Sequence, residues 1–188
     1  MITKQFLRQQ ALERRKKIPL ELKLKLDNKI FENLKNLKDF SNANLVLTYL
    51  STDLEIDTKE IIEFALKQGK TVAIPHCNEQ NELDFYKILN FDGLIKTKMG
   101  IIEPVANLQN KIVDFTSSIC ITPGLIFDKL GYRIGYGKGF YDKFFKNYHH
   151  KCVGLCYNEN VADEIPHDEH DKPVDVIVTQ SEILNKIN

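Results

Sequence analysis

Residues 44–75 alternate strand-like and helix-like patterns, and they constrain the fold more than any other part of the chain. NLVLTYL, residues 44–50, is a short β-branched and aromatic run typical of a buried strand. DTKEIIEFALKQGK follows with helical character; Asp57 and Glu60 have capping-box spacing, and Gly69 predicts the helix end. TVAIP predicts a second strand. Strand, helix and strand in this order predict a βαβ unit with parallel strands.

The rest of the chain continues the alternation. We expect helices over residues 3–17 and 19–37, the second with an apolar face made by Leu22, Leu26, Ile30, Leu34 and Leu37. ELDFYKI, GIIEP, SSICITPGL, KCVGLCY and VDVIVT are strand-like, and FYDKFFKNY is helix-like. The order predicts an α/β fold with a mostly parallel sheet flanked by helices, in one domain spanning residues 1–188.

Composition excludes several classes of protein. Of the 188 residues, 43% are hydrophobic and 28% are charged, as in ordinary globular proteins. The formal net charge is +0, so no overall field attracts nucleic acid or anionic membrane, and neither is an expected partner. The positive charge is local: residues 1–40 hold eleven Lys and Arg against five Asp and Glu, densest in LERRKK at residues 12–17. A solvated helix face explains that run equally well.

The N-terminal sequence MITKQFLRQQ lacks the apolar region of a signal peptide, and no apolar run is long enough to span a bilayer. We therefore expect a cytoplasmic protein. Cys77, Cys120, Cys152 and Cys156 lie mainly in strand-like runs, and the spacing of the last two is not that of a zinc or redox pair. We interpret the cysteines as small buried hydrophobic residues.

The segment GYRIGYGKGFYDKFF, residues 131–145, carries the chemistry. Gly135, Gly137 and Gly139 alternate with Tyr136 and Lys138, so the backbone N–H groups can turn toward one point and a ligand can approach closely. Phosphate suits such a loop, because a helix predicted to begin near Gly139 adds its positive end and the loop carries cationic side chains. The pattern is neither GxxxxGK[ST] nor GxGxxG, however.

A helix terminus alone is worth only about 0.3–1 kcal/mol, so cationic side chains and a metal ion must neutralise much of a triphosphate. Asp142, in the first turn after the glycines, is placed to reach Mg²⁺. Two alternatives stay open. The loop is also compatible with a glycine-rich turn whose tyrosines pack on a neighbouring element. Asp128 and Asp142 are also compatible with caps or turn residues, which for Asp128 is the favoured interpretation.

The stretch PGLIFDKLGYRIGYGKGFYDKFF, residues 123–145, closely resembles the signature of the 5-formyltetrahydrofolate cyclo-ligase family, roughly PGLAFD, a spacer and GxRLGxGxGYYD. KQFLR resembles the family's N-terminal KxxLR, YLSTDLEIDT its first strand and following loop, and KPVDVIVT its KxD segment. Phe140 and Lys143 depart from the Tyr and Arg that are common there. The resemblance implies a NagB/RpiA/CoA transferase-like fold. It also implies an enzyme that uses MgATP to convert a reduced folate, 5-formyltetrahydrofolate, to 5,10-methenyltetrahydrofolate, ADP and phosphate.

The resemblance also implies roles for individual residues. Lys138 and Arg133 would stabilise charge on the transferring phosphoryl group, and Asp142 and Asp175 would contact Mg²⁺. The expected ATP-binding residues are Lys4, Gln5, Phe6, Leu7, Arg8, Arg133, Ile134, Gly135, Tyr136, Gly137, Lys138, Gly139, Phe140 and Tyr141. The expected folate-binding residues are Arg8, Leu50, Glu55, Tyr136, Gly137, Lys138, Gly139 and Phe140.

The residues themselves agree with this chemistry. Positioning and charge stabilisation suffice for phosphoryl transfer, and no Ser or Cys stands in a nucleophile-elbow pattern. Lys4 and Arg8 have i, i+4 spacing, which puts them on one helix face. Glu55 follows a strand and can accept hydrogen bonds from a pterin ring; a surface charge is the alternative. The rival functions are a phosphosugar or acyl-CoA enzyme, and a nucleic-acid-binding module that uses the basic N-terminal helix.

Overall fold

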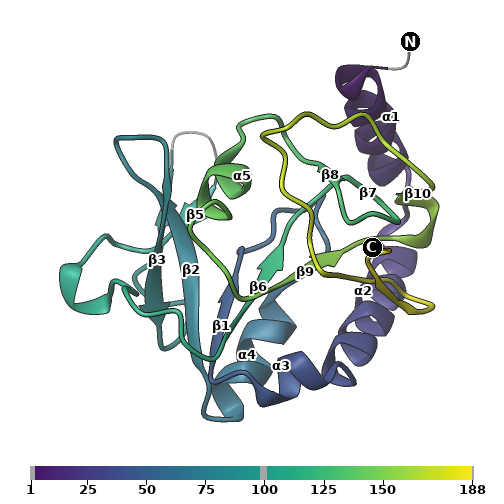
Figure 1. Cartoon of the computed structure of the whole chain (residues 1–188). Helices are drawn as coiled ribbons and strands as arrows, with labels where there is room; N and C mark the ends of the chain where they lie inside the picture. Colours follow the sequence, from purple (N-terminus) through teal and green to yellow (C-terminus); the bar gives the residue numbers. More distant parts are fainter. Residues whose placement is uncertain (1–2, 98–100, 188) are drawn as a thin grey trace.

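The computed structural model describes residues 3–97 and 101–187 (Figure 1). Within them, seven strands form one sheet in the order β12-β11-β9-β6-β1-β2-β3. The five inner strands run parallel, while β3 and β12 pair antiparallel at the two edges. The α/β class with a mostly parallel sheet is therefore confirmed. The strands are β1 (Leu45–Thr48), β2 (Thr71–Cys77), β3 (Leu83–Ile88), β6 (Ser118–Thr122), β9 (Lys151–Leu155), β11 (Val176–Val178) and β12 (Ile183–Asn185).

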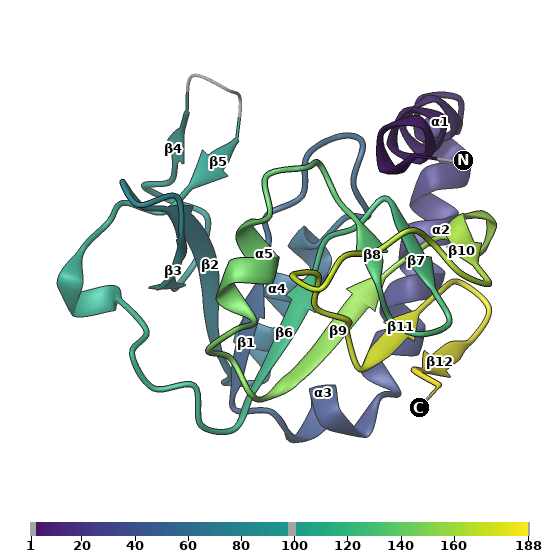
Figure 2. The same ribbon diagram turned by 45° about the horizontal axis from the view of Figure 1, so that its top comes forward.

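Helices cover both faces of the sheet. Figure 2 shows α5 in front of the strands, with α4 and α2 behind them. Because side chains alternate along a strand, Val46 of β1 packs in the cluster with α2, α3 and α4, while its neighbour Leu47 packs in the cluster with α5. β1 is buried at every position, which explains its unbroken apolar run. The helices are α1 (Lys4–Lys16), α2 (Leu20–Lys35), α3 (Lys38–Asn42), α4 (Lys59–Lys67) and α5 (Phe140–Phe144).

The βαβ unit forms as predicted, from β1 through α4 to β2. Gly69 has φ +75°, the left-handed conformation that ends many helices. The capping box was a wrong prediction. Thr58 is the N-cap residue, and Asp57 instead accepts from the Lys59 backbone N–H at 3.0 Å and from Ser51 Oγ at 2.9 Å. An Asx turn at Asp57 therefore provides a hydrogen-bond acceptor for a backbone N–H group at the start of α4.

The apolar face of α2 packs over only part of the helix. Ile30 and Leu34 are fully buried; Leu37 is nearly so, but it lies beyond the end of α2, as the N-cap residue of α3. Leu22 is 46% exposed, because the covered side of the first turns is instead formed by Lys23 and Asp27, whose side chains are 16% and 6% exposed. The periodicity therefore predicted the helix correctly but overestimated the length of its buried stripe.

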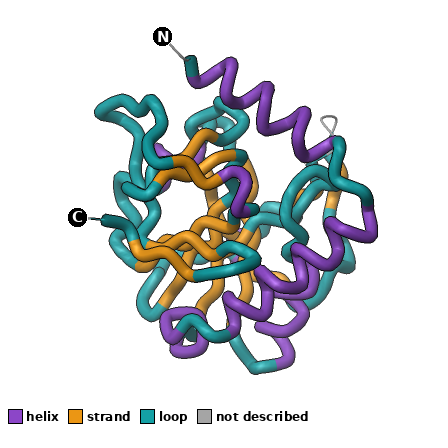
Figure 3. The backbone as a smooth tube through the Cα atoms, turned by 90° about the vertical axis from the view of Figure 1, so that its right-hand side faces the viewer, coloured by secondary structure: helices purple, strands orange, loops and turns teal. Residues whose placement is uncertain are grey.

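Two smaller sheets flank the central one. β7 (Ile126–Asp128), β8 (Arg133–Ile134) and β10 (Val161–Ala162) form the first, and β4 (Ile95–Lys96) and β5 (Ile102–Glu103) form a hairpin. GIIEP was expected to contain strand; β5 falls in it, and its Gly100 lies outside the described residues. Helix α1 runs along the top of the molecule in Figure 3 and packs its buried Ala11 against Ile126 and Ile134. No helix in the described ranges has the length and apolar character needed to cross a membrane.

Candidate active site

The glycine loop, residues 135–139, follows the β7–β8 hairpin. Asp128 shapes this hairpin: its Oδ1 accepts from the backbone N–H groups of Leu130 at 3.0 Å and Tyr132 at 2.9 Å, and its Oδ2 accepts from Ile165 at 3.1 Å. Asp128 is fully buried. The structure thus agrees with the favoured interpretation of this residue as a turn former.

The backbone of the glycine loop has the conformation and the N–H groups that an anion site needs. Gly137 and Gly139 have φ of +94° and +67°, in the region that favours glycine. In the described parts of the chain, the backbone N–H groups of Tyr136, Gly137 and Lys138 donate to no other residue. Helix α5, which begins after Gly139, has five residues, so its dipole is small and an anion at this loop would depend mainly on N–H groups and charged side chains.

Arg133 and Asp142 contact each other beside the loop. Arg133 Nη2 lies 2.8 Å from Asp142 Oδ1, and Arg133 Nη1 donates to the Lys172 carbonyl at 2.6 Å. The Lys172 backbone N–H completes the ring by donating to Asp142 Oδ1 at 3.2 Å. The Arg133 side chain is 5% exposed, and its guanidinium lies over Phe145 at 5.0 Å. We call Arg133, Asp142 and Lys172 the inner cluster.

Helix α1 closes the loop from the other side. Arg8 Nε donates to the Gly135 carbonyl at 2.8 Å. A Cβ added at Gly137 would lie 3.2 Å from Arg8 Cζ, so this glycine lets the guanidinium pack flat on the backbone. Leu7 packs in the cluster beneath α1, while Gln5 and Phe6 are exposed.

Lys4 is held by the segment that precedes β11. Its Nζ lies 2.5 Å from Asp168 Oδ2 and 2.5 Å from Asp171 Oδ2. Burial lowers the pKa of Lys4, but the hydrogen bonds to the two carboxylates outweigh it, so the net shift is upward. Two of the three N–H donors of this ammonium are thus already used by carboxylates.

Leu50 and Glu55 lie in the loop that follows β1, and both are buried. Glu55 Oε2 accepts from Thr52 twice, from its backbone N–H at 2.8 Å and from its hydroxyl at 2.9 Å. Burial, and then the Glu55 charge, raise the pKa of Tyr136 to about 12. Burial and Glu55 also raise the pKa of Tyr49. The structure thus brings Glu55 and the glycine loop together at the carboxyl end of β1, where parallel sheets commonly bind ligands.

Asp175, the second expected metal ligand, has other partners. Its Oδ2 accepts from the Cys152 backbone N–H at 2.9 Å, and its Oδ1 lies 3.2 Å from Lys186 Nζ. Asp175 precedes β11 and therefore lies at the amino end of that strand. No group of three or more His, Cys, Asp and Glu side chains in residues 3–97 and 101–187 is arranged to hold a metal ion.

The remaining expected residues surround these groups. Lys138 is exposed and makes no ion pair in the described ranges, and Phe140 begins α5. Tyr141 is oriented inward, and its hydroxyl is buried without a hydrogen-bond partner in the part of the chain that the structure describes. Cys120, Cys152 and Cys156 are buried as predicted, but the prediction was wrong for Cys77, which is only partly buried near the end of β2. Burial raises the pKa of Cys120 and of Cys156 to about 12, so neither is a ready nucleophile.

The sequence did not single out Arg15, Thr52 or the carboxylates that hold Lys4. Arg15 belongs to LERRKK, which composition alone presents as a charged surface, yet its side chain is buried. Its helical spacing from Arg8 and Ala11 was the available signal. The partners of Lys4, Asp168 and Asp171, are far away in the sequence and could be found only from the fold.

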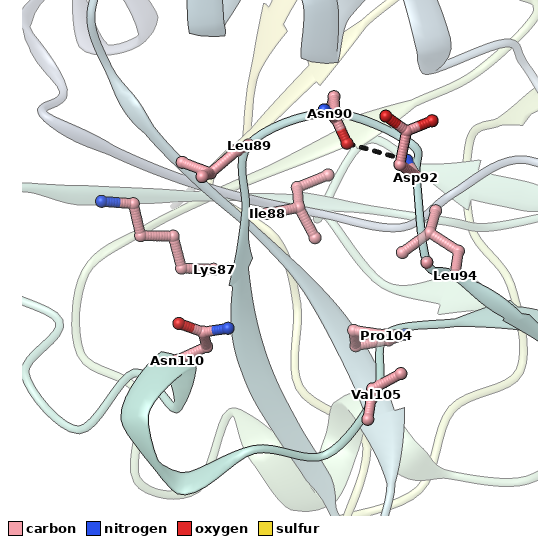
Figure 4. A pocket seen from close by; sticks show the side chains of 10 residues that line it. Lys87, Ile88, Leu89, Asn90, Asp92, Leu94, Pro104, Val105 and Asn110 are labelled. Atoms are coloured by element: carbon pink, nitrogen blue, oxygen red, sulfur yellow. Dashed lines mark hydrogen bonds between the residues drawn. The ribbon is translucent and has the colours of Figure 1, made fainter.

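One surface hollow lies elsewhere. It has a volume of about 430 Å³ and lies beside the end of β3, where Leu89, Leu94 and Val105 line it together with Lys87 and Asp92 (Figure 4). It contains none of the expected site residues. Its polar groups do not converge on one point, so we place the candidate site at the glycine loop.

Comparison with known proteins bears directly on this site. The sequence matches the 5-formyltetrahydrofolate cyclo-ligase family over residues 1–180, a range that includes every expected site residue. The chain belongs to the 5-formyltetrahydrofolate cyclo-ligase family. It is accordingly an enzyme of the ligase class.

Individual cyclo-ligase relatives agree with the family match. The chain is 32% identical over 158 residues to the 5-formyltetrahydrofolate cyclo-ligase of Haemophilus influenzae, covering 81% of this chain and 84% of the relative. It is 31% identical over 168 residues to a probable 5-formyltetrahydrofolate cyclo-ligase of Caenorhabditis elegans, covering 82% of each. The solved 5,10-methenyltetrahydrofolate synthetase of Aquifex aeolicus superposes with a TM-score of 0.87 at 31% identity, covering 100% of this chain and 94% of that one.

Proposed function

We propose that this protein converts 5-formyltetrahydrofolate to 5,10-methenyltetrahydrofolate and consumes ATP. The observation that carries the proposal is that α1 joins the two regions, Arg8 by donating to the Gly135 carbonyl of the glycine loop and Arg15 by donating to the Leu54 carbonyl beside Glu55, in a chain of the cyclo-ligase family. Glu55 offers a buried carboxylate to a pterin, and the glycine loop offers N–H groups to phosphates. A reaction between a folate and ATP needs both kinds of group in one place.

The substrate's N5-formyl group explains why ATP is required. Its oxygen is amide-like and leaves poorly, so the N10 amine cannot displace it unaided. In the proposed reaction the formyl oxygen attacks the γ-phosphorus, and ADP leaves. N10 then attacks the activated formyl carbon, loses its proton and expels inorganic phosphate as the ring closes. No covalent bond to the protein forms in this scheme.

The protein's part is to bind, orient and stabilise charge. We assign the phosphates to the N–H groups of residues 136–138, with Lys138 and Arg8 on either side. Arg133 would act from beneath, held in place by Asp142 and Lys172. The folate would contact Leu50 and Glu55.

The residues present fit a magnesium ion at Asp142. Its Oδ1 takes the bonds from Arg133 and Lys172, and in the described residues its Oδ2 has no hydrogen-bond partner. One carboxylate oxygen is enough, because Mg²⁺ usually keeps several waters and binds substrate phosphates as well. Bound there with nucleotide, Mg²⁺ would neutralise phosphate charge. Asp175 could bind the ion only if its ion pair with Lys186 were broken, so we assign the ion to Asp142.

An assay for the methenyl product tests the proposal. Purified protein with 5-formyltetrahydrofolate and MgATP should produce the near-ultraviolet absorbance of 5,10-methenyltetrahydrofolate, and omission of ATP should abolish it. Absence of that absorbance with ATP and with every other nucleoside triphosphate would refute the proposed function. A phosphosugar or acyl-CoA enzyme on this scaffold would give that negative result.

A further inference from the structure

Arg15 lies at the end of α1 and joins the loops that follow two neighbouring strands. Its Nη1 donates to the Leu54 carbonyl at 3.2 Å, after β1, and its Nη2 donates to the Gly124 carbonyl at 2.5 Å, after β6. β1 and β6 are adjacent and parallel, so their carboxyl ends lie side by side. One guanidinium therefore holds together the two strand ends at the candidate site.

The charge of Arg15 lacks the usual partner. The side chain is buried, and the ion pairs of the described residues do not include it. Its Nε has no hydrogen-bond partner in the same residues. Burying a cation without a carboxylate partner is costly, and a neutral amide side chain can also donate to carbonyls. Stability alone therefore gives a weak reason for an arginine here.

The β1 loop that Arg15 holds is the one that carries Glu55. The Glu55 backbone N–H donates to the Thr52 carbonyl at 3.0 Å, and Thr52 donates back to the Glu55 carboxylate. These bonds close a tight turn over residues 52–55, and Arg15 grips the Leu54 carbonyl inside it. Movement of Arg15 would thus move the Glu55 carboxylate. The effects of Arg15 and Glu55 on the pKa of Tyr136, which are opposite in sign, agree with this proximity.

A second layer holds Arg15 in turn. Its guanidinium lies over the Tyr157 ring at 5.7 Å. The Tyr157 hydroxyl donates to Asp27 Oδ1 at 2.6 Å, and Lys23 of α2 pairs with the same carboxylate. The hydrogen bond to Asp27 fixes the Tyr157 ring. The Arg15 guanidinium is therefore held both by this ring and by the Leu54 and Gly124 carbonyls.

Arg8 and Arg15 lie two turns apart on α1, and they contact different parts of the site. Arg8 donates to the Gly135 carbonyl of the glycine loop, whereas Arg15 donates to the carbonyls that follow β1 and β6 and lies beside Tyr136 of the loop. We propose that Arg15 is a positioning residue for folate binding, which sets the Leu54–Glu55 segment through its two carbonyl contacts. This proposal rests on the proposed function, since it assumes a folate at Glu55.

Binding measurements on full-length variants test this role. Arg15→Gln removes the charge, Arg15→Lys keeps the charge but cannot hold two carbonyls in a fork, and Arg14→Gln is the matched control. Arg14 is the neighbouring arginine on the same helix, is exposed, and donates to the Glu159 carbonyl at 3.2 Å, away from the site. Isothermal titration gives separate Kd values for 5-formyltetrahydrofolate and ATP, and steady-state kinetics gives KM and kcat.

We expect Arg15→Gln to raise the Kd and KM for 5-formyltetrahydrofolate about tenfold or more, because the substitution removes a charged hydrogen-bonding group. The Kd and KM for ATP should change less than about twofold. Arg15→Lys should be intermediate, and it supplies the result if Arg15→Gln does not fold. Arg14→Gln should leave both Kd values unchanged.

Three outcomes would overturn the assignment. In the first, folded Arg15 variants bind folate like the parent. In the second, folate and ATP binding weaken equally, which a general loss of structure would cause. In the third, the parent protein itself does not bind 5-formyltetrahydrofolate, and then the proposed function fails as well.

Discussion

Arg133 and Lys138 belong to the same glycine-rich segment, yet the protein holds their charges in opposite ways. Arg133 is almost fully buried and contacts Asp142, the Lys172 carbonyl and the Phe145 ring. Lys138 is exposed at the tip of the loop and pairs with no carboxylate in residues 3–97 and 101–187. The inner cluster therefore has a fixed geometry before any ligand binds. At the rim of the site, which Lys4 and Lys138 form, Lys4 is held by two carboxylates, whereas Lys138 is free to move.

The difference teaches which charges can change partner. A buried ion pair is expensive to break, because it leaves an uncompensated charge. The pair of Lys4 with Asp168, whose side chain is 73% exposed, is worth little, so a phosphate can replace that carboxylate. On this basis we expect substitution of Arg133 or Asp142 to lower turnover strongly, and substitutions at the rim to change mainly the ATP requirement.

The largest effect should come from Asp142→Asn. The substitution removes the charge opposite Arg133 and the proposed magnesium ligand, so kcat/KM should fall by about 100-fold or more. Steady-state assays across a Mg²⁺ titration measure this, and a thermal melt checks folding. Near-normal turnover at saturating Mg²⁺ would remove Asp142 from the metal role.

Asp175→Asn is the matched control, because both carboxylates were expected to bind the metal. Asp175 accepts from Cys152 and pairs with Lys186, so its loss should lower the free energy of unfolding by about 1 kcal/mol without changing the Mg²⁺ dependence. A Mg²⁺ requirement shifted as strongly as in Asp142→Asn would instead favour a site that includes both residues.

A smaller effect is expected from Gly137→Ala, which tests the contact between loop and rim. The new Cβ would lie 3.2 Å from Arg8 Cζ at a φ of +94°, so the guanidinium must move. We expect the KM for ATP to rise about tenfold, in line with a strained left-handed alanine and a displaced cation. Gly135→Ala, where a Cβ meets nothing within 4 Å, should cost less. Equal losses in the two variants would contradict the role of Arg8.

The parts of the site that the sequence predicted are those encoded locally. Three features lie in short stretches of sequence whose residue pattern indicates their role without knowledge of the fold: the glycine loop, Asp142 and the βαβ unit. The capping box failed because α4 begins one residue later than it requires, with Thr58 as the N-cap residue, and the Asp57 backbone N–H donates to Asp27. Arg15 was missed because its burial depends on the loops after β1 and β6, and its spacing from Arg8 and Ala11 on α1 was a weak local signal.

Contacts between residues far apart in the chain were likewise not predicted from the sequence. Lys4 was predicted to contact phosphate, and the structure adds that Asp168 and Asp171 hold it. Lys172 was not singled out, because it contributes its backbone rather than its side chain to the inner cluster. Local sequence thus predicted the ligand chemistry, while the groups that position it emerged only from tertiary packing.

Lys138→Ala should have a moderate effect on the rim. The KM for ATP should rise by up to about tenfold, with a smaller change in kcat, because an exposed cation contributes mostly to phosphate binding. Lys146→Ala, an exposed lysine just after α5, is the matched control. The loss should shrink at high salt, which screens exposed charges. An unchanged rate at low ATP would mean that Lys138 is only a surface charge.

The smallest effect concerns the pair between Lys4 and Asp171. Burial raises the pKa of Asp171, but the hydrogen bond from Lys4 outweighs it, and the net pKa lies below the ordinary value. A carboxyl whose pKa is depressed by folding stabilises the protein above its unfolded pKa, near 3.8, and this contribution disappears as the pH falls below that value. Thermal unfolding in the absence of nucleotide should therefore show Asp171→Asn to be less stable than the parent by about 0.5 kcal/mol near neutral pH. The difference should vanish in acid. A difference that stays constant down to acid pH would mean that Asp171 stabilises the fold through its backbone turn and not through the charge of Lys4.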